Sequence, residues 1–173
     1  MIAHTADLDC DSPMRLLRTV HWHLRDGFCG ALQSLGRGLA AGPCDPDGIL
    51  HLLHRLLDGC EKLHEVERGA LMELSCRPDS SWANEDVLWG IGVLRRKADA
   101  VRAATCGGAL LPCVRDLHGY LAVFFGELLV QLHAKEEALA QIGRTAPPNA
   151  ARRCSRGLAE VIELLDLGQE RTS

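Results

Sequence analysis

Residues 49–74 read ILHLLHRLLDGCEKLHEVERGALMEL, and one apolar stripe runs through about seven helical turns of this stretch. Its members recur at alternating spacings of three and four residues: Leu50, Leu53, Leu57, Cys60, His64, Glu67, Leu71 and Leu74. Because these spacings place side chains on one face of an α-helix, the stretch is predicted to be one amphipathic helix. His64 and Glu67 lie inside the stripe. A carboxylate buried there needs a cation, a hydrogen-bond partner or a proton.

Comparable stretches lie on both sides of this one, separated by breaks rich in Gly and Pro. Ser12 and Pro13 form a typical helix start, and Pro112 can start another helix. The predicted helices cover residues 13–41, 49–74, 82–105 and 112–143, with a shorter one over 150–167. Four long helices with short links predict an all-α fold, an up-down-up-down four-helix bundle with a short C-terminal accessory helix.

The domain organisation follows from the same breaks. We expect residues 1–12 to be an N-terminal extension, 13–146 the four-helix bundle, and 147–173 a linker with the C-terminal helix. A chain of 173 residues has the length of one ordinary domain. Aromatic residues make up only 4%, and Ala, Leu, Arg and Glu dominate, which also favours helices.

Charge and composition argue against several classes of function. The net charge of -4 and the pI near 6.0 give no basic surface for nucleic acid. The apolar runs are too short to cross a bilayer, and no secretion signal is visible at the N-terminus. We therefore expect a soluble, cytoplasmic protein with neither a nucleic-acid nor a membrane partner. None of the eight cysteines forms a C-x-x-C pair, so we expect reduced and mostly buried thiols.

The predicted first and fourth helices also carry histidines. The first has an apolar stripe of Met14, Leu17, His21, Leu24, Phe28, Ala31 and Leu35, which predicts that His21 points inward and His23 outward. The strongest stripe of the fourth is Leu117, Leu121, Phe124, Leu128, Leu132, Leu139 and Ile142. His133 lies about 100° from that stripe, on a face where small residues such as Gly126 would let another helix approach.

Two interpretations of these residues stay open. Three histidines on three helices, two of them followed by carboxylates within one turn, predict a metal site between the helices. The alternative is that each histidine is a hydrogen-bonded core residue. In that case Glu65, Glu136 and Glu137 are solvated charges, which Lys135 or Arg68 could neutralise.

Three short segments resemble the signature segments of hemerythrin-like, or HHE cation-binding, domains. They are VHWHLR at 20–25, LHEVE at 63–67 and LHAKEEAL at 132–139, and the resemblance spans about residues 14–143. In that family four antiparallel helices hold a pair of non-haem iron ions through histidines and bridging carboxylates. The resemblance implies His21, His64 and His133 as iron ligands, with Glu137 as the carboxylate four residues after its histidine.

The chain departs from the family pattern at two places. Arg68 occupies the position of the second-helix carboxylate, which leaves Glu67 or Glu65 to substitute for it. The predicted third helix has no histidine, and the residues that could stand in for one are Asn84, Glu85 and Asp86. The expected metal ligands are therefore His21, His64, Glu67, His133 and Glu137, holding one or two iron ions.

The resemblance implies a non-haem iron protein that binds, senses or handles a small molecule, namely dioxygen, nitric oxide or peroxide. Whether such a protein turns over a substrate is left open. The alternative function is a metal-free, degenerate helical bundle that acts as an interaction or regulatory module with a protein partner. Arg68 and the absence of a histidine between residues 82 and 105 favour this alternative.

Overall fold

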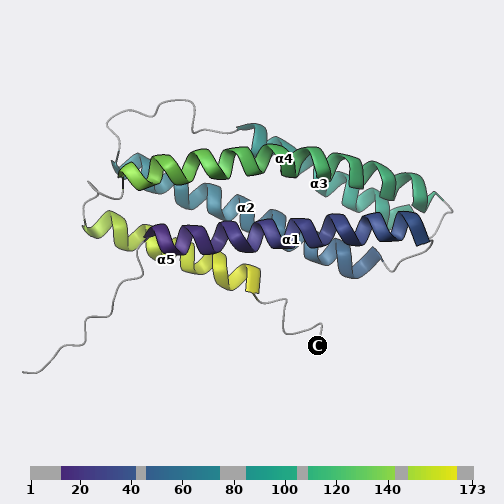
Figure 1. Ribbon diagram of the computed structural model, residues 1–173, viewed down its shortest axis with the longest axis horizontal. Helices are drawn as coiled ribbons and strands as arrows, with labels where there is room; N and C mark the ends of the chain where they lie inside the picture. The colour runs from purple at the N-terminus through teal and green to yellow at the C-terminus, as the bar shows by residue number, and fades with distance from the viewer. Residues whose placement is uncertain (1–12, 42–45, 75–84, 105–108, 143–147, 167–173) are drawn as a thin grey trace, which may run out of the picture.

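The computed structural model describes residues 13–41, 46–74, 85–104, 109–142 and 148–166, with side chains except at 70–74, 85, 137–142 and 148. This part of the chain is helical and contains no strand, which confirms the all-α prediction. The helices are α1 (Pro13–Ala41), α2 (Pro46–Leu74), α3 (Glu85–Ala104), α4 (Leu110–Ile142) and α5 (Pro148–Asp166), shown in Figure 1.

Proline sets the start of three of these helices. Pro13, Pro46 and Pro148 are each the first residue of a helix, a position where the missing N–H costs nothing and the fixed φ is already helical. For this reason α2 begins at Pro46, before the predicted Ile49. The other predicted ends agree closely with the structure, and the expected start of the third helix, at Trp82, lies outside the described residues.

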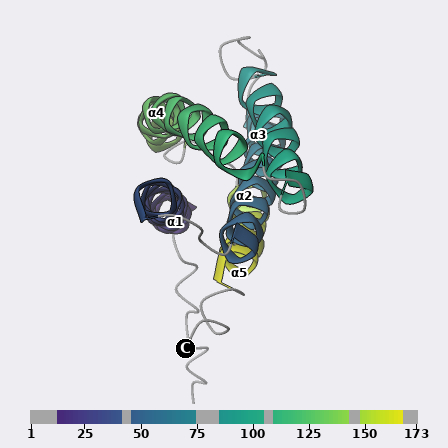
Figure 2. The ribbon, with the colours of Figure 1, turned by 90° about the vertical axis from the view of Figure 1, so that its right-hand side faces the viewer.

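The fifth helix is part of the core, although the sequence suggested an accessory element. α5 packs along α2 and α1, while α4 has α1 and α3 as its main neighbours (Figure 2). Leu158, Val161 and Leu165 of α5 are buried in the same apolar cluster as the leucines of α1 and α2. The strongly one-sided apolar stripe of α5 explains this, because it can be buried only against other helices.

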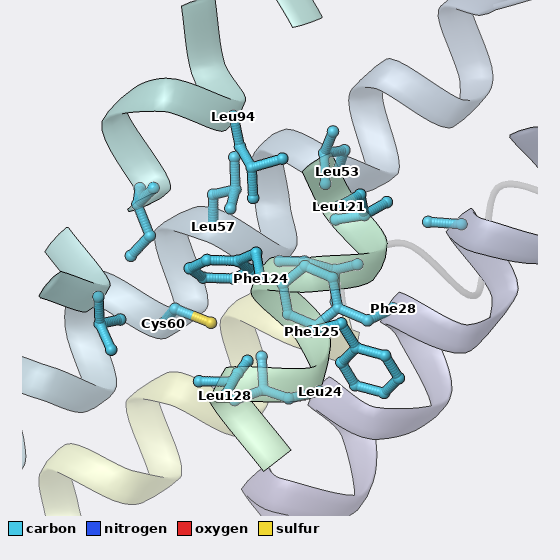
Figure 3. Close-up of a cluster of buried hydrophobic side chains, with 14 of the residues drawn as sticks. Leu24, Phe28, Leu53, Leu57, Cys60, Leu94, Leu121, Phe124, Phe125 and Leu128 are labelled. Carbon is cyan, nitrogen blue, oxygen red and sulfur yellow. The ribbon is translucent and has the colours of Figure 1, made fainter. Parts of the chain in front are cut away.

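The middle of the interior is apolar. Phe28 of α1 packs against Phe124 and Phe125 of α4, with ring centroids 5.9 and 5.7 Å apart. Figure 3 shows these rings meeting Leu57 of α2 and Leu94 of α3, so four helices contribute to one packed layer. Such close packing fixes how the helices lie relative to one another, and thereby positions the polar residues further along the same stripes.

The described cysteines differ in exposure. Cys29 is exposed, Cys60 is buried, and Cys113 and Cys154 are intermediate; no disulfide joins any of these four. The expectation of mostly buried thiols is therefore wrong for Cys29, which lies on the outer side of α1. The other four cysteines lie outside the described residues. Within the described ranges, no helix has both the length and the apolar character that a bilayer span requires.

Candidate metal centre

The candidate site lies where polar side chains enter the interior on α1, α2 and α4. His21, Glu67 and Lys135 are only 2%, 4% and 8% exposed, and they are the buried polar or charged residues in the described part of the chain. Glu136, beside Lys135 on α4, reaches His21. We call His21, Glu67, Lys135 and Glu136 the interior polar cluster.

His21 is held by a carboxylate from α4. Its Nδ1 lies 2.7 Å from Oε1 of Glu136. Burial lowers the pKa of His21 below its ordinary value, and the hydrogen bond to Glu136 opposes that shift. The neutral ring then donates from Nδ1 to the carboxylate, which leaves a lone pair on Nε2. This Nε2 atom is buried, and no hydrogen-bond partner for it lies among the described residues.

Glu67 is held by a lysine from the same helix as Glu136. Lys135 Nζ donates to Oε2 of Glu67 at 2.5 Å, with both side chains almost wholly buried. Burial raises the pKa of Glu67, and the ammonium of Lys135 opposes that rise. The structure thus supplies a cation for the carboxylate in the apolar stripe of α2. The other oxygen, Oε1, is buried with no partner among the described residues.

Lys135 was expected only as a possible partner of solvated glutamates, and its place in the interior was missed. The apolar stripe of α4 contains Leu128 and Leu132, and Lys135 follows one turn later on the same face, where it is buried. A signal was present, because the predicted stripe passes from Leu132 to Leu139 without a member in the turn between them. The aliphatic stem of a lysine can fill such a position while its charged end reaches a partner.

The other predicted ligands are less closely associated with the cluster. His64 is half-buried on α2, and burial lowers its pKa, with Lys135 and Arg68 adding to the effect. His133 is exposed on α4. The side chain of Glu137 lies outside the described residues, so its part in a site stays a prediction.

The residues considered as substitutes are placed as follows. Glu65 is exposed and lies 3.5 Å from Lys62 on its own helix. Asp86 is exposed on α3, whereas Asn84 and the side chain of Glu85 lie outside the described residues. None of these four residues is therefore placed at the interior polar cluster by the part of the chain that the structure describes.

Three polar residues outside the interior polar cluster pair with neighbouring helices. His23 was predicted to point outward, but its Nδ1 lies 3.4 Å from Oδ1 of Asp166, because α5 covers that side of α1. The carboxylates of Asp58 and Glu61 on the polar side of α2 both accept hydrogen bonds from Arg95 of α3. Arg95 thus supplies positive charge to both carboxylates on this side of α2.

Cys60 lies one turn before His64 on α2 and faces the interior. Burial raises the pKa of its thiol to about 12, so the thiol stays protonated at neutral pH. A protonated thiol is both a poor metal ligand and a poor nucleophile. Cys60 therefore acts here as a small apolar residue of the core (Figure 3).

The donors in the described ranges do not fit a pair of iron ions. No three side chains of His, Cys, Asp or Glu gather there in a way that could hold a metal ion. His21 and Glu67 do reach the same polar cluster, but the ammonium of Lys135 is bonded to Glu67. Positive charges repel each other strongly in a poorly solvated interior, so this ammonium competes with a metal ion for the same carboxylate.

No protein-family model, curated protein or solved structure matches this chain.

Proposed function

We propose that this protein is a metal-free helical bundle of the hemerythrin-like, up-down-up-down type that acts as an interaction or regulatory module. The observation that carries the proposal is the buried pair of Lys135 and Glu67. In this interpretation the lysine ammonium takes the place that a metal cation would occupy beside the carboxylate of α2.

The energetics of the pair support the proposal. A buried carboxylate is tolerated only when a cation or donors compensate its lost hydration, and Lys135 provides both charge and hydrogen bond. A metal ion at Glu67 would lie beside this ammonium, and the two positive charges would repel each other strongly in the poorly solvated interior. Arg68, at the position of the expected carboxylate, is an exposed cation and cannot replace the missing ligand.

The surface supports a role in interaction. Among the side chains that the structure describes, six large apolar ones are exposed: Trp22, Leu88, Trp89, Leu111, Val123 and Val130. Single exposed apolar residues are common. Tryptophan has a large apolar ring, however, and Trp22 and Trp89 are both more than half exposed, so covering them would remove a considerable apolar area from water. Aromatic side chains are enriched where proteins bind one another.

Iron binding is the second candidate, because two buried atoms would accept a cation. His21 Nε2 and Glu67 Oε1 have no hydrogen-bond partner in the described part of the chain, and Glu136 orients His21 as a carboxylate commonly orients a ligating histidine. His21 and Glu67 would hold the ion, with His64, His133 and Glu137 as the other predicted ligands. The iron would supply the reactivity toward dioxygen, nitric oxide or peroxide.

Metal content separates the two candidates. The full chain is purified without air and without an affinity tag, incubated with ferrous iron, passed through a desalting column and analysed for metals. We expect far less than one iron per chain, because Lys135 already neutralises Glu67. One or two irons per chain that are lost in His21→Ala would contradict the metal-free proposal. The control is His51→Ala, which alters an exposed histidine of α2.

A further inference from the structure

The outward side of α1 carries basic and aromatic side chains in its N-terminal half. The inner side of this helix packs against α2, α4 and α5 (Figure 2). On the outward side Arg15, Arg18, Trp22 and Arg25 are all exposed, and their spacings of three, four and three residues place them on one face. We call these four residues the basic stripe of α1. An open hollow of about 510 Å³ lies along it, lined by Met14, Arg15, Arg18, Thr19 and Trp22.

The charge of α1 is opposite to that of the whole chain. The helix contains four arginines and one aspartate, a net charge of +3, whereas the chain has -4. Three of the four arginines belong to the basic stripe. Positive charge concentrated on one face of an otherwise acidic protein attracts an anionic partner to that face. The charge of the stripe therefore indicates the chemistry of what it binds.

Carboxylates of the neighbouring helices do not neutralise this charge. Two of them that reach α1 are already paired with its histidines, Glu136 with His21 and Asp166 with His23. Among the described residues Arg18 and Arg25 form no ion pair. The aspartate of α1, Asp26, lies beyond Arg25 at the far end of the stripe. Both guanidinium groups can therefore pair with carboxylates of another molecule.

The ring of Trp22 is held in place although it is 60% exposed. It meets the ring of His23 edge to face, with centroids 5.1 Å apart, and His23 is paired in turn with Asp166 of α5. An aromatic ring that is already held loses little conformational freedom when a partner covers it. Tryptophan and arginine are also the residues that most often dominate the energy of protein interfaces.

We propose that the basic stripe of α1 binds an acidic peptide segment of a partner protein, in which carboxylates flank an apolar side chain. The carboxylates pair with Arg18 and Arg25, and the apolar side chain packs on Trp22 between them. Hydrogen bonds from arginine to carboxylate are charge-assisted and directional, which gives such a contact its specificity. The inference rests on the proposed function, because it names the class of partner that the interaction module takes.

The dimensions of the stripe fit a short peptide. From Arg15 to Arg25 the helix rises about 15 Å, a distance that about five extended residues span. A nucleic acid strand would continue past the stripe onto a chain whose remaining net charge is negative, so the short acidic segment fits better. Because the contact is small and exposed to water, we expect weak binding that weakens further as salt is added.

The test titrates the isotope-labelled full chain with a short synthetic peptide in which glutamates flank a leucine. Two-dimensional NMR follows each tryptophan through its indole N–H. We expect the Trp22 signal to shift and saturate, while the Trp89 signal stays in place. Trp89 is a matched internal control, since it is 66% exposed on α3 but has the exposed Asp86 one turn before it. A peptide with glutamines in place of the glutamates should leave both signals unchanged.

Charge reversal tests the role of the arginines. Arg18→Glu should raise the dissociation constant of the glutamate peptide at least tenfold, because attraction is replaced by repulsion. Arg96→Glu, at an exposed position of α3, is the matched control and should leave the dissociation constant unchanged. Both variants should keep the wild-type midpoint of thermal unfolding, since both side chains are exposed.

Three results would overturn the proposal: a Trp22 signal that does not move, equal shifts of the Trp22 and Trp89 signals, or an affinity that Arg18→Glu leaves unchanged. Tighter binding of a short single-stranded oligonucleotide than of the peptide would also overturn it and assign the stripe to nucleic acid. Metal content measured on the same samples separates these outcomes from a failure of the metal-free proposal, because no expected metal ligand belongs to the basic stripe.

A further variant tests whether the stripe is occupied by this chain itself. Asp7, Asp9 and Asp11 precede α1 in the sequence and have the charge that the stripe attracts. Replacing all three by asparagine should leave the affinity for the glutamate peptide within about twofold of wild type. If the peptide bound only to this variant, the occupant would be the chain's own N-terminal residues, and the proposal of a partner protein would be wrong.

Discussion

The interior of this protein has two regions that are both largely buried but held together differently. In the apolar middle, Phe28 packs between Phe124 and Phe125, and each contact is one of many small, non-directional attractions. In the interior polar cluster, Glu67 depends on one ammonium, that of Lys135. The apolar region can therefore tolerate adjustment by its neighbours, whereas the polar region depends on a specific pairing of charges.

Both regions lie on the same helical stripes. Phe28 and His21 share one face of α1, two turns apart, and both are almost wholly inaccessible to solvent. The comparison teaches that the position of a residue on a helical stripe determines whether its side chain is buried, but not which kind of interaction stabilises it there. The partner on the facing helix decides whether a buried group is stabilised by packing, by charge or by a bound ion.

The largest loss of stability should come from a substitution in the apolar middle. Phe28→Ala removes a fully buried ring and leaves a cavity, so the free energy of unfolding should fall by about 4 kcal/mol. Urea unfolding followed by circular dichroism measures this change. Val123→Ala, one residue from Phe124 but 60% exposed, is the control and should have little effect. A loss below about 1 kcal/mol for Phe28→Ala would show that the region is not packed as described.

The next effect should come from breaking the charge pair. Lys135→Met keeps the volume but leaves Glu67 buried without its cation, which should cost about 3 kcal/mol at neutral pH. With Lys135 removed, the pKa of Glu67 should rise further, so its proton is bound more tightly in the folded than in the unfolded state. The penalty should therefore shrink as pH falls toward about 4, where the carboxyl is protonated in both states.

The double variant sharpens the comparison. Adding Glu67→Leu to Lys135→Met replaces the ion pair by apolar residues, so stability should return to within about 1 kcal/mol of wild type or exceed it. Lys62→Met is the matched control, because Lys62 makes only partly exposed ion pairs with Glu65 and Glu160 and should lose well under 1 kcal/mol. A double variant no more stable than Lys135→Met would contradict the role given to this pair.

The smallest effect should be a change in how the free energy of unfolding depends on pH when His21 is replaced. The pKa of His21 is lower in the folded chain than its ordinary value of 6.5, so the unfolded chain binds the proton more tightly. Stability from this residue is present above pH 6.5 and is lost as pH falls from there through the folded pKa. His21→Leu should make the fall in unfolding free energy shallower over this range. His64, whose pKa is also lowered, should keep some of the slope.

An unchanged slope in His21→Leu would mean that the ring is not buried in its neutral form. The control is the same substitution at the exposed His51, made in parallel and measured over the same pH range. Together with the stability changes of the Phe28 and Lys135 variants, this measurement would show how strongly the stability of each region depends on the ionisation of its side chains.

The helices could be predicted because their signals are local. The stripe from Leu50 to Glu67 in α2 and the proline at the start of α1 involve residues within a few turns of each other, and spacing alone reveals them. The same signals placed His21 and Glu67 in the interior, where they are found. They gave the wrong direction for His23, because the position of α5 over that side of α1 depends on packing between distant segments.

The candidate site could be predicted only in part. The place of Glu67 in an apolar stripe indicated that its carboxylate needs a compensating partner such as a cation. The stripe did not indicate which residue supplies that cation. Lys135 is 68 residues away in sequence, and periodicity gives the face of a helix but not which turn of one helix lies beside which turn of another. The place of Glu137 in the site stays a prediction.

The sequence by itself therefore determined the helices, their buried faces and the presence of a carboxylate that must be compensated, because each depends on spacing within one helix. Only the tertiary structure decided that Lys135 meets Glu67, that Glu136 meets His21 and that α5 joins the core. Those outcomes depend on how far each helix slides and turns against its neighbours, which the packing of rings such as Phe28 and Phe124 settles across the whole interior.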